Sequence, residues 1–372
     1  MMDKSIGHHY MINDGLTEMA ANAVELVVDK HTGIAYACYL SSETQLGEST
    51  SIVKIAKFNI LQPTNVVWAT IFDKNVDFNG DLLLECNIVE LNETTLRVYC
   101  VNMITWEYFY KDVDKKTLKA GELRKLALKV NDDAQPVHYT RDNVNEYFKT
   151  LGGDVFTNLQ LTSPIVKVGD VFYTTSCGGE CQDKTLFLRS TDGETWTINS
   201  VIPFGSNYEA VLCYHDNKFW VMLRRGERQP TGNKKQHLIY SEDGVNWIKT
   251  DLALECSETR PYLFNYQGGL YLAYSSPLPL DFSTVRPFRC NIHVGKIVAN
   301  GENTIFEEEI YKESKFGIVY YALTDWNGNM IMLYSSGELN PTRGLMLGWS
   351  QGKDCLNYTV LKYQDPVLKF EE

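Results

Sequence analysis

Residues 208–225 read YEAVLCYHDNKFWVMLRR, and the rest of the chain is best interpreted outward from them. Two runs rich in aliphatic and aromatic residues flank the polar residues 215–218, a pattern typical of a β-hairpin. With Asp216-Asn217 as a two-residue turn, Glu209 lies directly opposite Arg224. Opposed residues of an antiparallel pair have Cβ atoms roughly 4.5–5.5 Å apart. We therefore expect the Glu209 carboxylate and the Arg224 guanidinium to form an ion pair.

A turn motif that occurs twice gives the second signal. Residues 190–196 (STDGETW) and 241–247 (SEDGVNW) both read Ser-x-Asp-Gly-x-x-Trp, and the two copies start 51 residues apart. In such a turn aspartate accepts hydrogen bonds from backbone amides, glycine adopts positive φ, and tryptophan fills the gap between neighbouring sheets. The spacing predicts an internal repeat of one β-sheet unit.

The composition is that of a globular protein. Of the 372 residues, 44% are hydrophobic and 12% are aromatic, which excludes a disordered chain. The formal net charge of −12 argues against non-specific nucleic-acid binding and against binding to anionic membrane surfaces. It leaves an acidic sugar open as a ligand, because local basic groups can outweigh the total charge.

The first residues and the cysteines bear on the cellular compartment. Residues 1–9 (MMDKSIGHH) contain no apolar signal-peptide segment, and no run reaches the roughly 18 apolar residues of a membrane span. The nine cysteines are odd in number and scattered, which favours reduced thiols. We expect a cytoplasmic protein, or a secreted one if the start of the chain has been trimmed.

Repeated hairpins predict an all-β fold, a six-bladed β-propeller with four-stranded antiparallel blades. We interpret residues 1–372 as a single domain, with an insertion at about 113–154 that includes a short helix or loop near residues 142–151. The N-terminal ten residues are expected to complete the last blade. The expected blades are approximately 16–60, 64–112, 155–200, 205–250, 258–312 and 317–365.

Three residues share one offset, seven positions before the first residue of their hairpin turn: Glu209 before Asp216, Arg260 before Gln267 and Tyr320 before Asn327. If each hairpin begins with the innermost strand of its blade, these side chains converge on one rim of the central depression, where ligands bind. Arg224 joins them across its hairpin from Glu209. Arg–Glu pairs and strand tyrosines are often structural, but the coincidence of four such residues favours a functional site.

These features resemble the sialidase superfamily. The two Ser-x-Asp-Gly-x-x-Trp segments are similar to its Asp-box, or BNR repeat, and residues 185–340 resemble its catalytic half. The resemblance rests on Glu209 with Arg224, on Arg289 in the segment RCNI, and on Tyr320 before a hairpin that ends in Leu333-Tyr334. It implies that Tyr320 is a nucleophile, that Glu209 is its base, and that the arginines bind the carboxylate of an acidic sugar.

The N-terminal half departs from the sialidase pattern. Sialidases open with an Arg-Ile-Pro-like strand that supplies a clamp arginine, whereas this region reads ANAV at 21–24 and residues 1–96 contain no arginine. Asn22 takes that position as a candidate sugar ligand, and Arg260 is the candidate substitute for the missing arginine. Glu48, with Glu43 as second choice, is the candidate acid/base. A uronic acid or another modified sugar is therefore an alternative substrate.

The sequence thus predicts a sialidase-like glycoside hydrolase that acts on a terminal acidic sugar, with no cofactor. A glycan lyase or an inverting glycosidase on the same fold, and a non-catalytic carbohydrate-binding propeller, remain alternatives. Cys177 and Cys181 lack a second Cys/His pair nearby, so no metal site is expected. The expected partner is a glycan or oligosaccharide, without nucleic acid or membrane, and the oligomeric state is left open.

Overall fold

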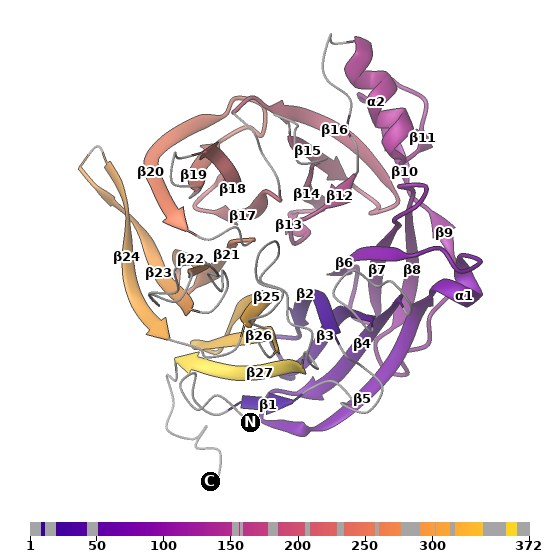
Figure 1. The fold of residues 1–372 in the computed structure, drawn as a ribbon, viewed down its shortest axis with the longest axis horizontal. Helices are drawn as coiled ribbons and strands as arrows, with labels where there is room; N and C mark the ends of the chain where they lie inside the picture. The colour runs from indigo at the N-terminus through magenta and orange to yellow at the C-terminus, as the bar shows by residue number, and fades with distance from the viewer. Residues whose placement is uncertain are drawn as a thin grey trace, which may run out of the picture.

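Strands arranged around a central axis dominate the structure, a computed structural model (Figure 1). It describes residues 9–11, 20–42, 51–150, 156, 159–177, 185–204, 209–228, 234–256, 260–276, 291–301, 303–312, 317–337 and 355–362. The described strands form a β-propeller, in which β2 (Ala20–Val28), β6 (Leu83–Glu90), β17 (Val211–His215), β21 (Tyr262–Tyr266) and β25 (Gly317–Trp326) are the strands of the four-stranded sheets that lie nearest the axis (Figure 1).

Five of the sheets are four-stranded antiparallel blades. The first contains β2 (Ala20–Val28), β3 (Ile34–Ser42), β4 (Ser51–Asn59) and β5 (Gln62–Asp73). The second contains β6 (Leu83–Glu90), β7 (Thr95–Asn102), β8 (Tyr108–Asp114) and β9 (Arg124–Lys125). A later blade contains β17 (Val211–His215), β18 (Lys218–Arg228), β19 (Lys234–Ser241) and β20 (Ile248–Cys256). The blade after it contains β21 (Tyr262–Tyr266), β22 (Gly269–Ser276), β23 (Asn291–Asn300) and β24 (Asn303–Lys312).

The last blade is completed by the N-terminal residues, as expected from the sequence. It contains β25 (Gly317–Trp326), β26 (Asn329–Gly337), β27 (Cys355–Lys362) and, as its outermost strand, β1 (His9–Met11). His9 pairs with Thr359 in an antiparallel ladder. The two ends of the chain thus share one sheet, which holds the ring closed.

The remaining sheet has seven strands and departs from the regular blade. Its central part is an antiparallel meander of β13 (Val166–Val168), β14 (Val171–Cys177), β15 (Thr185–Ser190) and β16 (Thr195–Ile202). Three short strands extend it, β10 (Ala127–Lys129), β11 (Val137–His138) and β12 (Gln160–Leu161), and β10 runs parallel to β16. The helices are α1 (Lys74–Asp77) and α2 (Arg141–Thr150), and α2 lies at the periphery beside β10 and β11 (Figure 1).

The first two sheets are bounded differently from the expected blades. The first sheet continues through β5 to Asp73, well beyond residue 60, and the second starts only at Leu83. Pro63 would interrupt a strand in the middle of a sheet, because proline has no amide hydrogen to donate. Strand β5 is an outermost strand, however, and an edge strand tolerates a proline. The expected insertion at 113–154 is divided, because β9 joins the second sheet whereas β10 and β11 join the seven-stranded one.

The hairpin turns confirm the predicted register. Asp216 and Asn217 both have positive φ, 48° and 57°, as a type I′ turn requires. Val211 pairs with Met222 and His215 with Lys218, the register that the two-residue turn predicts. Asn327 and Gly328 form the corresponding turn of the last blade, with φ of 50° and 78°.

The hydrophobic core lies between sheets rather than in one central volume. Each of five buried clusters contains side chains from neighbouring sheets, and one of them joins the first blade to the last two. Burial of apolar area contributes about 25 cal/mol per Å². The same contacts that stabilise each sheet therefore also fix its neighbours around the axis.

The two Ser-x-Asp-Gly turns have the same hydrogen bonds. Asp192 Oδ1 accepts from the amides of Glu194 (2.7 Å) and Thr195 (2.8 Å), and the Gly193 amide donates to Ser190 Oγ (2.8 Å). In the second turn Asp243 Oδ1 accepts from the amides of residues 245 and 246 at 2.8 and 2.7 Å. The glycines have φ of 70° and 71°, a left-handed conformation that costs glycine little.

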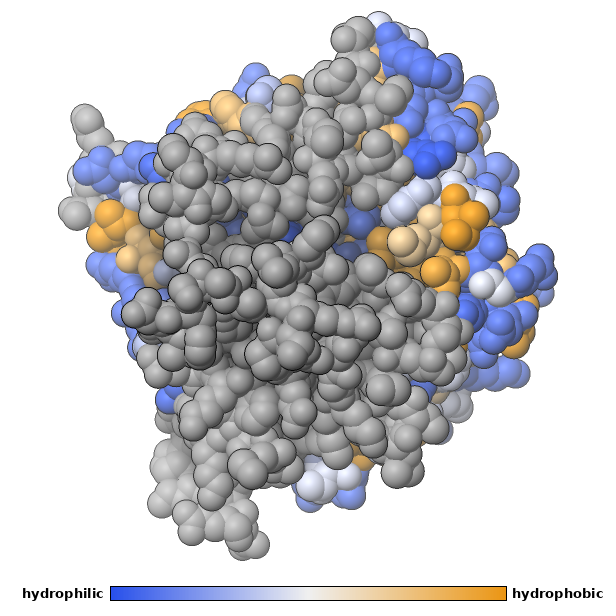
Figure 2. All heavy atoms as spheres, viewed as in Figure 1, coloured by the Kyte–Doolittle hydropathy of each residue, from blue (hydrophilic) through white to orange (hydrophobic). Residues whose placement is uncertain are grey.

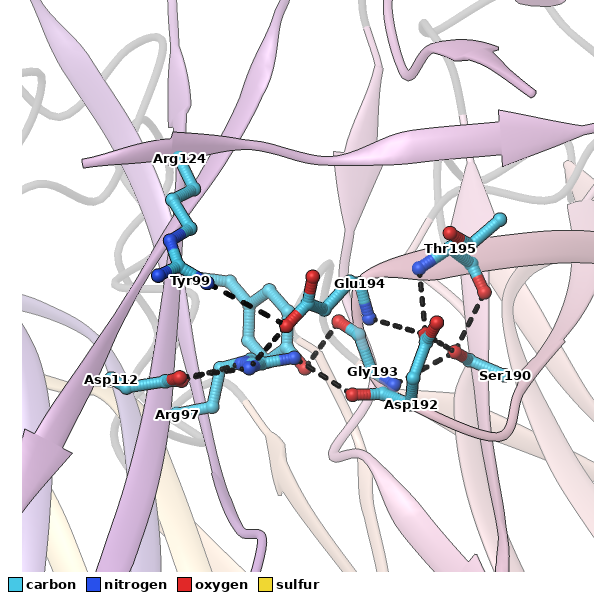
Figure 3. Close-up of polar contacts among 9 residues, drawn as sticks. All are labelled: Arg97, Tyr99, Asp112, Arg124, Ser190, Asp192, Gly193, Glu194 and Thr195. Carbon is cyan, nitrogen blue, oxygen red and sulfur yellow. Dashed lines mark hydrogen bonds and ion pairs between the residues drawn. The ribbon is translucent and has the colours of Figure 1, made fainter. Parts of the chain in front are cut away.

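The preceding sheet holds the first of these turns (Figure 3), and Asn199 and Ser200 of β16 donate hydrogen bonds to Gly244 O of the second. Tyr99 on β7 donates a hydrogen bond to Gly193 O at 3.0 Å, and Arg97 donates to Asp192 O at 2.8 Å. Arg97 also pairs with Asp112 at 2.6 Å and with Glu194 at 3.0 Å. The turns therefore act as inter-sheet contacts, away from the residues discussed below as the site.

Replacing Arg97 with alanine is expected to lower the free energy of unfolding by about 2 kcal/mol. The Arg97 side chain is 3% exposed, but Asp112 and Glu194 are 37% and 41% exposed, so water partly compensates their lost ion pairs. Urea denaturation measures the change. Arg124→Ala is the control, because Arg124 is 54% exposed and lies 4.0 Å from Glu194. An equal loss in both variants contradicts the inter-sheet role of Arg97.

Large apolar side chains on the described surface are scattered over several elements. Most of the coloured surface in Figure 2 is hydrophilic, with separate apolar areas near the edge. The exposed residues of this kind are Leu61, Val67, Trp68, Val76, Ile104, Val137, Val245, Ile248 and Tyr311. Neither of the described helices has the length and apolar character needed to cross a membrane.

Candidate functional site

The beginnings of the inner strands carry the candidate site. Glu209 stands just before β17, Arg260 just before β21, and Tyr320 lies near the start of β25. A register shift in β25 between Ile318 and Tyr321 marks a β-bulge around Tyr320. Bulges turn individual side chains out of the regular alternation, and they are common beside active sites.

The predicted pair of Glu209 and Arg224 is present in the structure. Arg224 Nη1 and Glu209 Oε2 form an ion pair, and the two residues are 6% and 4% exposed. Because a buried charge is stable only with a partner, each of these groups depends on the other. Val211 of β17 pairs with Met222 of β18, and the same register places Glu209, two residues before Val211, opposite Arg224, two residues after Met222.

Arg260 is the hub of the cluster. Its Nη2 atom lies 2.6 Å from Glu85 Oε1 and 3.4 Å from Glu209 Oε1, and its Cζ atom lies 5.5 Å from the centre of the Tyr320 ring. The structure therefore brings together Glu209, Arg224, Arg260 and Tyr320, four of the residues singled out in the sequence. Arg260 is 8% exposed and Tyr320 is partly exposed.

Two glutamates were missed in the sequence, Glu85 on β6 and Glu25 on β2. Both are 4% exposed, and both lie where their inner strand is bulged, between Leu84 and Cys86 and between Asn22 and residue 25. A signal for Glu85 was available, since it stands seven positions before Asn92 in its hairpin turn, the offset shared by the other three residues. No such offset marks Glu25.

Glu85 and Glu209 have unusual backbone conformations. Their φ angles are 56° and 52°, in the left-handed region, although neither residue is in a hairpin turn. A non-glycine residue pays roughly 1–2 kcal/mol for this conformation, so the surrounding structure must impose it. Its effect is to direct both carboxylates at Arg260.

The carboxyl group of Glu25 has a raised pKa. Burial raises the pKa of its carboxyl to about 8, while Arg260 opposes the rise and Glu85 adds to it. The carboxyl therefore holds a proton at neutral pH. Burial by itself lowers the pKa of Arg260, but the nearby Glu85, Tyr320 and Glu25 raise it by more. The pKa of Arg260 is therefore above its ordinary value, and the guanidinium stays charged.

A buried thiol lies behind the cluster. The Glu209 amide donates a hydrogen bond to Cys177 Sγ at 3.2 Å, and burial raises the pKa of this thiol to about 12. Cys181, the other half of the pair weighed as a metal site, lies outside the described residues. Within the described ranges no three His, Cys, Asp or Glu side chains are grouped to hold a metal ion.

Four of the candidate residues lie wholly or partly outside the described part of the chain. Glu48 and Arg289, like Glu43, lie outside the described residues. The backbone of Asn22 is part of β2, but its side chain is outside the described part of the chain. Their roles as acid/base and as sugar ligands stay predictions.

Glu25→Gln is expected to remove a pH dependence of folding stability. Because the pKa of Glu25 is about 8 in the folded protein and ordinarily 4.5, the unfolded chain loses this proton at lower pH. The stabilising contribution is complete below pH 4.5 and is lost toward pH 8, by up to about 1.4 kcal/mol per pH unit. Urea midpoints between pH 5 and pH 8 should show the variant gaining on the wild type as the pH rises.

The control for this measurement is Glu90→Gln. Glu90 lies at the far end of β6, is 40% exposed, and pairs with Lys115 at 3.2 Å. Its stability should follow the wild type at every pH. A Glu25→Gln difference that stays constant from pH 5 to pH 8 contradicts a protonated Glu25 in the folded protein.

Comparison with solved structures identifies the class of fold. Trypanosoma rangeli sialidase with the inhibitor DANA superposes with a TM-score of 0.61 at 11% identity, over 92% of this chain and 55% of the sialidase. The same enzyme with 2,3-difluorosialic acid, described as a covalent intermediate, gives 0.60 at 12% identity over 92% and 54% of the chains. NanB with optactamide gives 0.53 at 10% identity over 95% of this chain and 71% of NanB.

The protein thus has a sialidase-like β-propeller fold, as the sequence resemblance predicted. It spans about 55% of the length of the Trypanosoma sialidase. Identities near 10% establish the fold and leave the activity open. No protein-family model matches the chain, and no curated protein matches its sequence.

Proposed function

We propose that the protein is a sialidase-like glycoside hydrolase that acts on a terminal acidic sugar of the sialic-acid or uronic-acid type. The observation that carries the proposal is the buried cluster of Glu209, Arg224 and Arg260 beside the partly exposed Tyr320. A clustering of arginine, glutamate and tyrosine where inner strands begin supports a site for an anionic sugar.

In this proposal Tyr320 is the nucleophile and Glu209 is the base. A phenol is a weak nucleophile near neutral pH, and a neighbouring carboxylate that accepts its proton makes it competent to attack. Arg260 contacts both residues, which supports their acting on one substrate. A neutral attacking group also suits an anomeric carbon that carries a carboxylate.

Arg224 and Arg260, with Arg289 and Asn22 as further candidates, would bind the sugar's carboxylate and neighbouring hydroxyls. Guanidinium groups bind carboxylates through paired hydrogen bonds, which gives orientation as well as affinity. Glu48 is proposed to transfer the proton to the leaving group. The sugar-bound sialidase structures support a carbohydrate as the ligand.

We further propose six blades in one domain. The antiparallel meander β13–β16 provides four strands in the seven-stranded sheet, and β10, β11 and β12 are then additions to a third blade. With the five regular blades this makes six. Buried clusters that join neighbouring sheets all around the axis support this count.

The function is tested by turnover of fluorogenic glycosides of sialic acid, glucuronic acid, galacturonic acid and neutral sugars. We expect release of the fluorophore from one acidic sugar, without a product that absorbs in the ultraviolet. An ultraviolet-absorbing, unsaturated product identifies a lyase instead, and inversion at the anomeric carbon in the product's NMR spectrum contradicts the tyrosine mechanism. Binding of a sugar without turnover leaves the carbohydrate-binding alternative.

A further inference from the structure

The charges of the cluster do not balance without a proton. Three carboxyl groups, those of Glu25, Glu85 and Glu209, face two guanidinium groups, those of Arg224 and Arg260, and none of the five residues is more than 8% exposed. Burying an uncompensated charge costs several kcal/mol. The raised pKa of the Glu25 carboxyl keeps that group protonated and neutral, so two carboxylates face two guanidinium groups. These five described residues of the ligand-free cluster therefore carry no net positive charge to attract an anion.

The pair of Glu85 and Arg260 nevertheless has unused hydrogen-bonding capacity. Glu85 Oε2 and Arg260 Nε are both buried, and neither has a hydrogen-bond partner among the described residues. Their other atoms, Glu85 Oε1 and Arg260 Nη2, are 2.6 Å apart. One acceptor and one donor of this ion pair are thus left without a described partner, where a buried polar atom costs roughly 1–3 kcal/mol if it stays unsatisfied.

We propose that this site binds a carboxylate ligand together with one proton. The ligand's carboxylate takes the place of Glu85 at Arg260, and the displaced Glu85 carboxyl takes up the proton from solvent. The proposal rests on the proposed function in assuming an acidic ligand, and it names Glu85 as the residue that makes binding of that ligand depend on pH.

Electrostatics gives the reason for the proton. An added carboxylate leaves three negative charges, on the ligand, Glu85 and Glu209, against the two arginines. Protonating Glu85 restores neutrality, because like charges at close range cannot all be ionised in a buried site. The neutral Glu85 carboxyl then has a hydrogen to donate to the ligand's carboxylate.

The groups that surround Glu85 and Glu25 fit this assignment. Besides Glu209, Arg260 and Arg224 of β18, the titratable neighbours are Tyr262, Cys86, Tyr320, Cys177 and Tyr108, and Glu25 pairs in register with Cys38 of β3. Burial raises the pKa of Tyr262 and of Cys86 well above their ordinary values, so both stay neutral. Among the described neighbours, the carboxyl groups are therefore the acceptors for the proton.

Isothermal titration calorimetry tests the proposal, with DANA and glucuronic acid as the probes. Titrations in two buffers of different ionisation enthalpy, repeated from pH 6 to pH 8.5, count the protons taken up. We expect uptake of about one proton for each ligand bound, and a Kd that rises about tenfold per pH unit through this range. Binding without proton uptake overturns the proposal, and so does failure of both probes to bind at any pH.

The double variant Glu25→Gln/Glu85→Gln should bind the probe without proton uptake and with a Kd nearly independent of pH. Glu90→Gln, at the exposed end of the same strand, should behave like the wild type. If the double variant does not fold, the number of protons that the wild type takes up for each ligand bound still tests the proposal. Proton-coupled binding without turnover upholds this inference and overturns the hydrolase, whereas turnover with proton-independent binding does the reverse.

Discussion

Tyr320→Phe is expected to abolish turnover, with kcat reduced at least about 10³-fold on whichever acidic glycoside the wild type cleaves. Phenylalanine lacks the hydroxyl that would form the covalent bond to the sugar, so neither attack nor proton transfer to Glu209 is possible. The ring is kept, and Tyr320 packs against the buried cluster that joins the first blade to the last two. Folding stability should therefore change little, which separates the loss of activity from unfolding.

Tyr321→Phe is the matched control for this change. Tyr321 is the next residue on β25, but it is 5% exposed and belongs to the hydrophobic cluster. Its substitution removes the same hydroxyl from the neighbouring position and should leave turnover within a few-fold of the wild type. Turnover that survives in Tyr320→Phe, or that is lost equally in both variants, moves the chemistry to other residues.

Arg260→Met should be the most destabilising substitution of the cluster, with a loss of about 3–5 kcal/mol near pH 7.5. Methionine fills a similar volume but leaves Glu85 and Glu209 without the guanidinium that both contact. Among the described residues, Glu209 then keeps its ion pair with Arg224, whereas Glu85 loses its ion pair with residue 260. Urea denaturation monitored by tryptophan fluorescence measures the effect.

The loss in Arg260→Met should shrink as the pH falls. Without the guanidinium, the pKa values of the buried carboxyls are higher in the folded variant than in the unfolded chain. A raised acid pKa contributes stability that is present at low pH and is lost as the pH rises, so the deficit should be smaller at pH 5 than at pH 8. Arg124→Met, at a 54% exposed position, serves as the control, and a pH-independent deficit contradicts the charge argument.

Local patterns determined the hairpins and part of the site. Turn residues such as Asp216-Asn217 and Asn327-Gly328 favour positive φ, and here they adopt it, so the sequence predicted the register of their strands from the turns alone. From that register followed the pairing of Glu209 with Arg224, and from the common offset followed the meeting with Arg260 and Tyr320. The regular blades were predictable for the same reason, since hairpin after hairpin repeats one local rule.

The outer boundaries of the sheets were less predictable. The expected bounds of 16–60 and 64–112 divided β5 from its sheet; Pro63 would interrupt the middle of a sheet but is tolerated in this edge strand. The parallel pairing of β10 with β16 joins residues 127–129 to residues 195–197, and no local pattern records such a contact. Edge strands depend on what covers them, which is a property of the folded molecule.

The sequence by itself thus determined the class of fold, the hairpin registers and four residues of the cluster, because these follow from turn chemistry and periodicity. Only the tertiary structure decided that Glu85 and Glu25 complete it. Glu85 meets Arg260 across 175 residues of chain, and the bulges in β2 and β6 shift which side chain faces the axis. A bulge of one residue reverses the alternation of a strand, and its position depends on packing against neighbouring blades rather than on the residues within the strand.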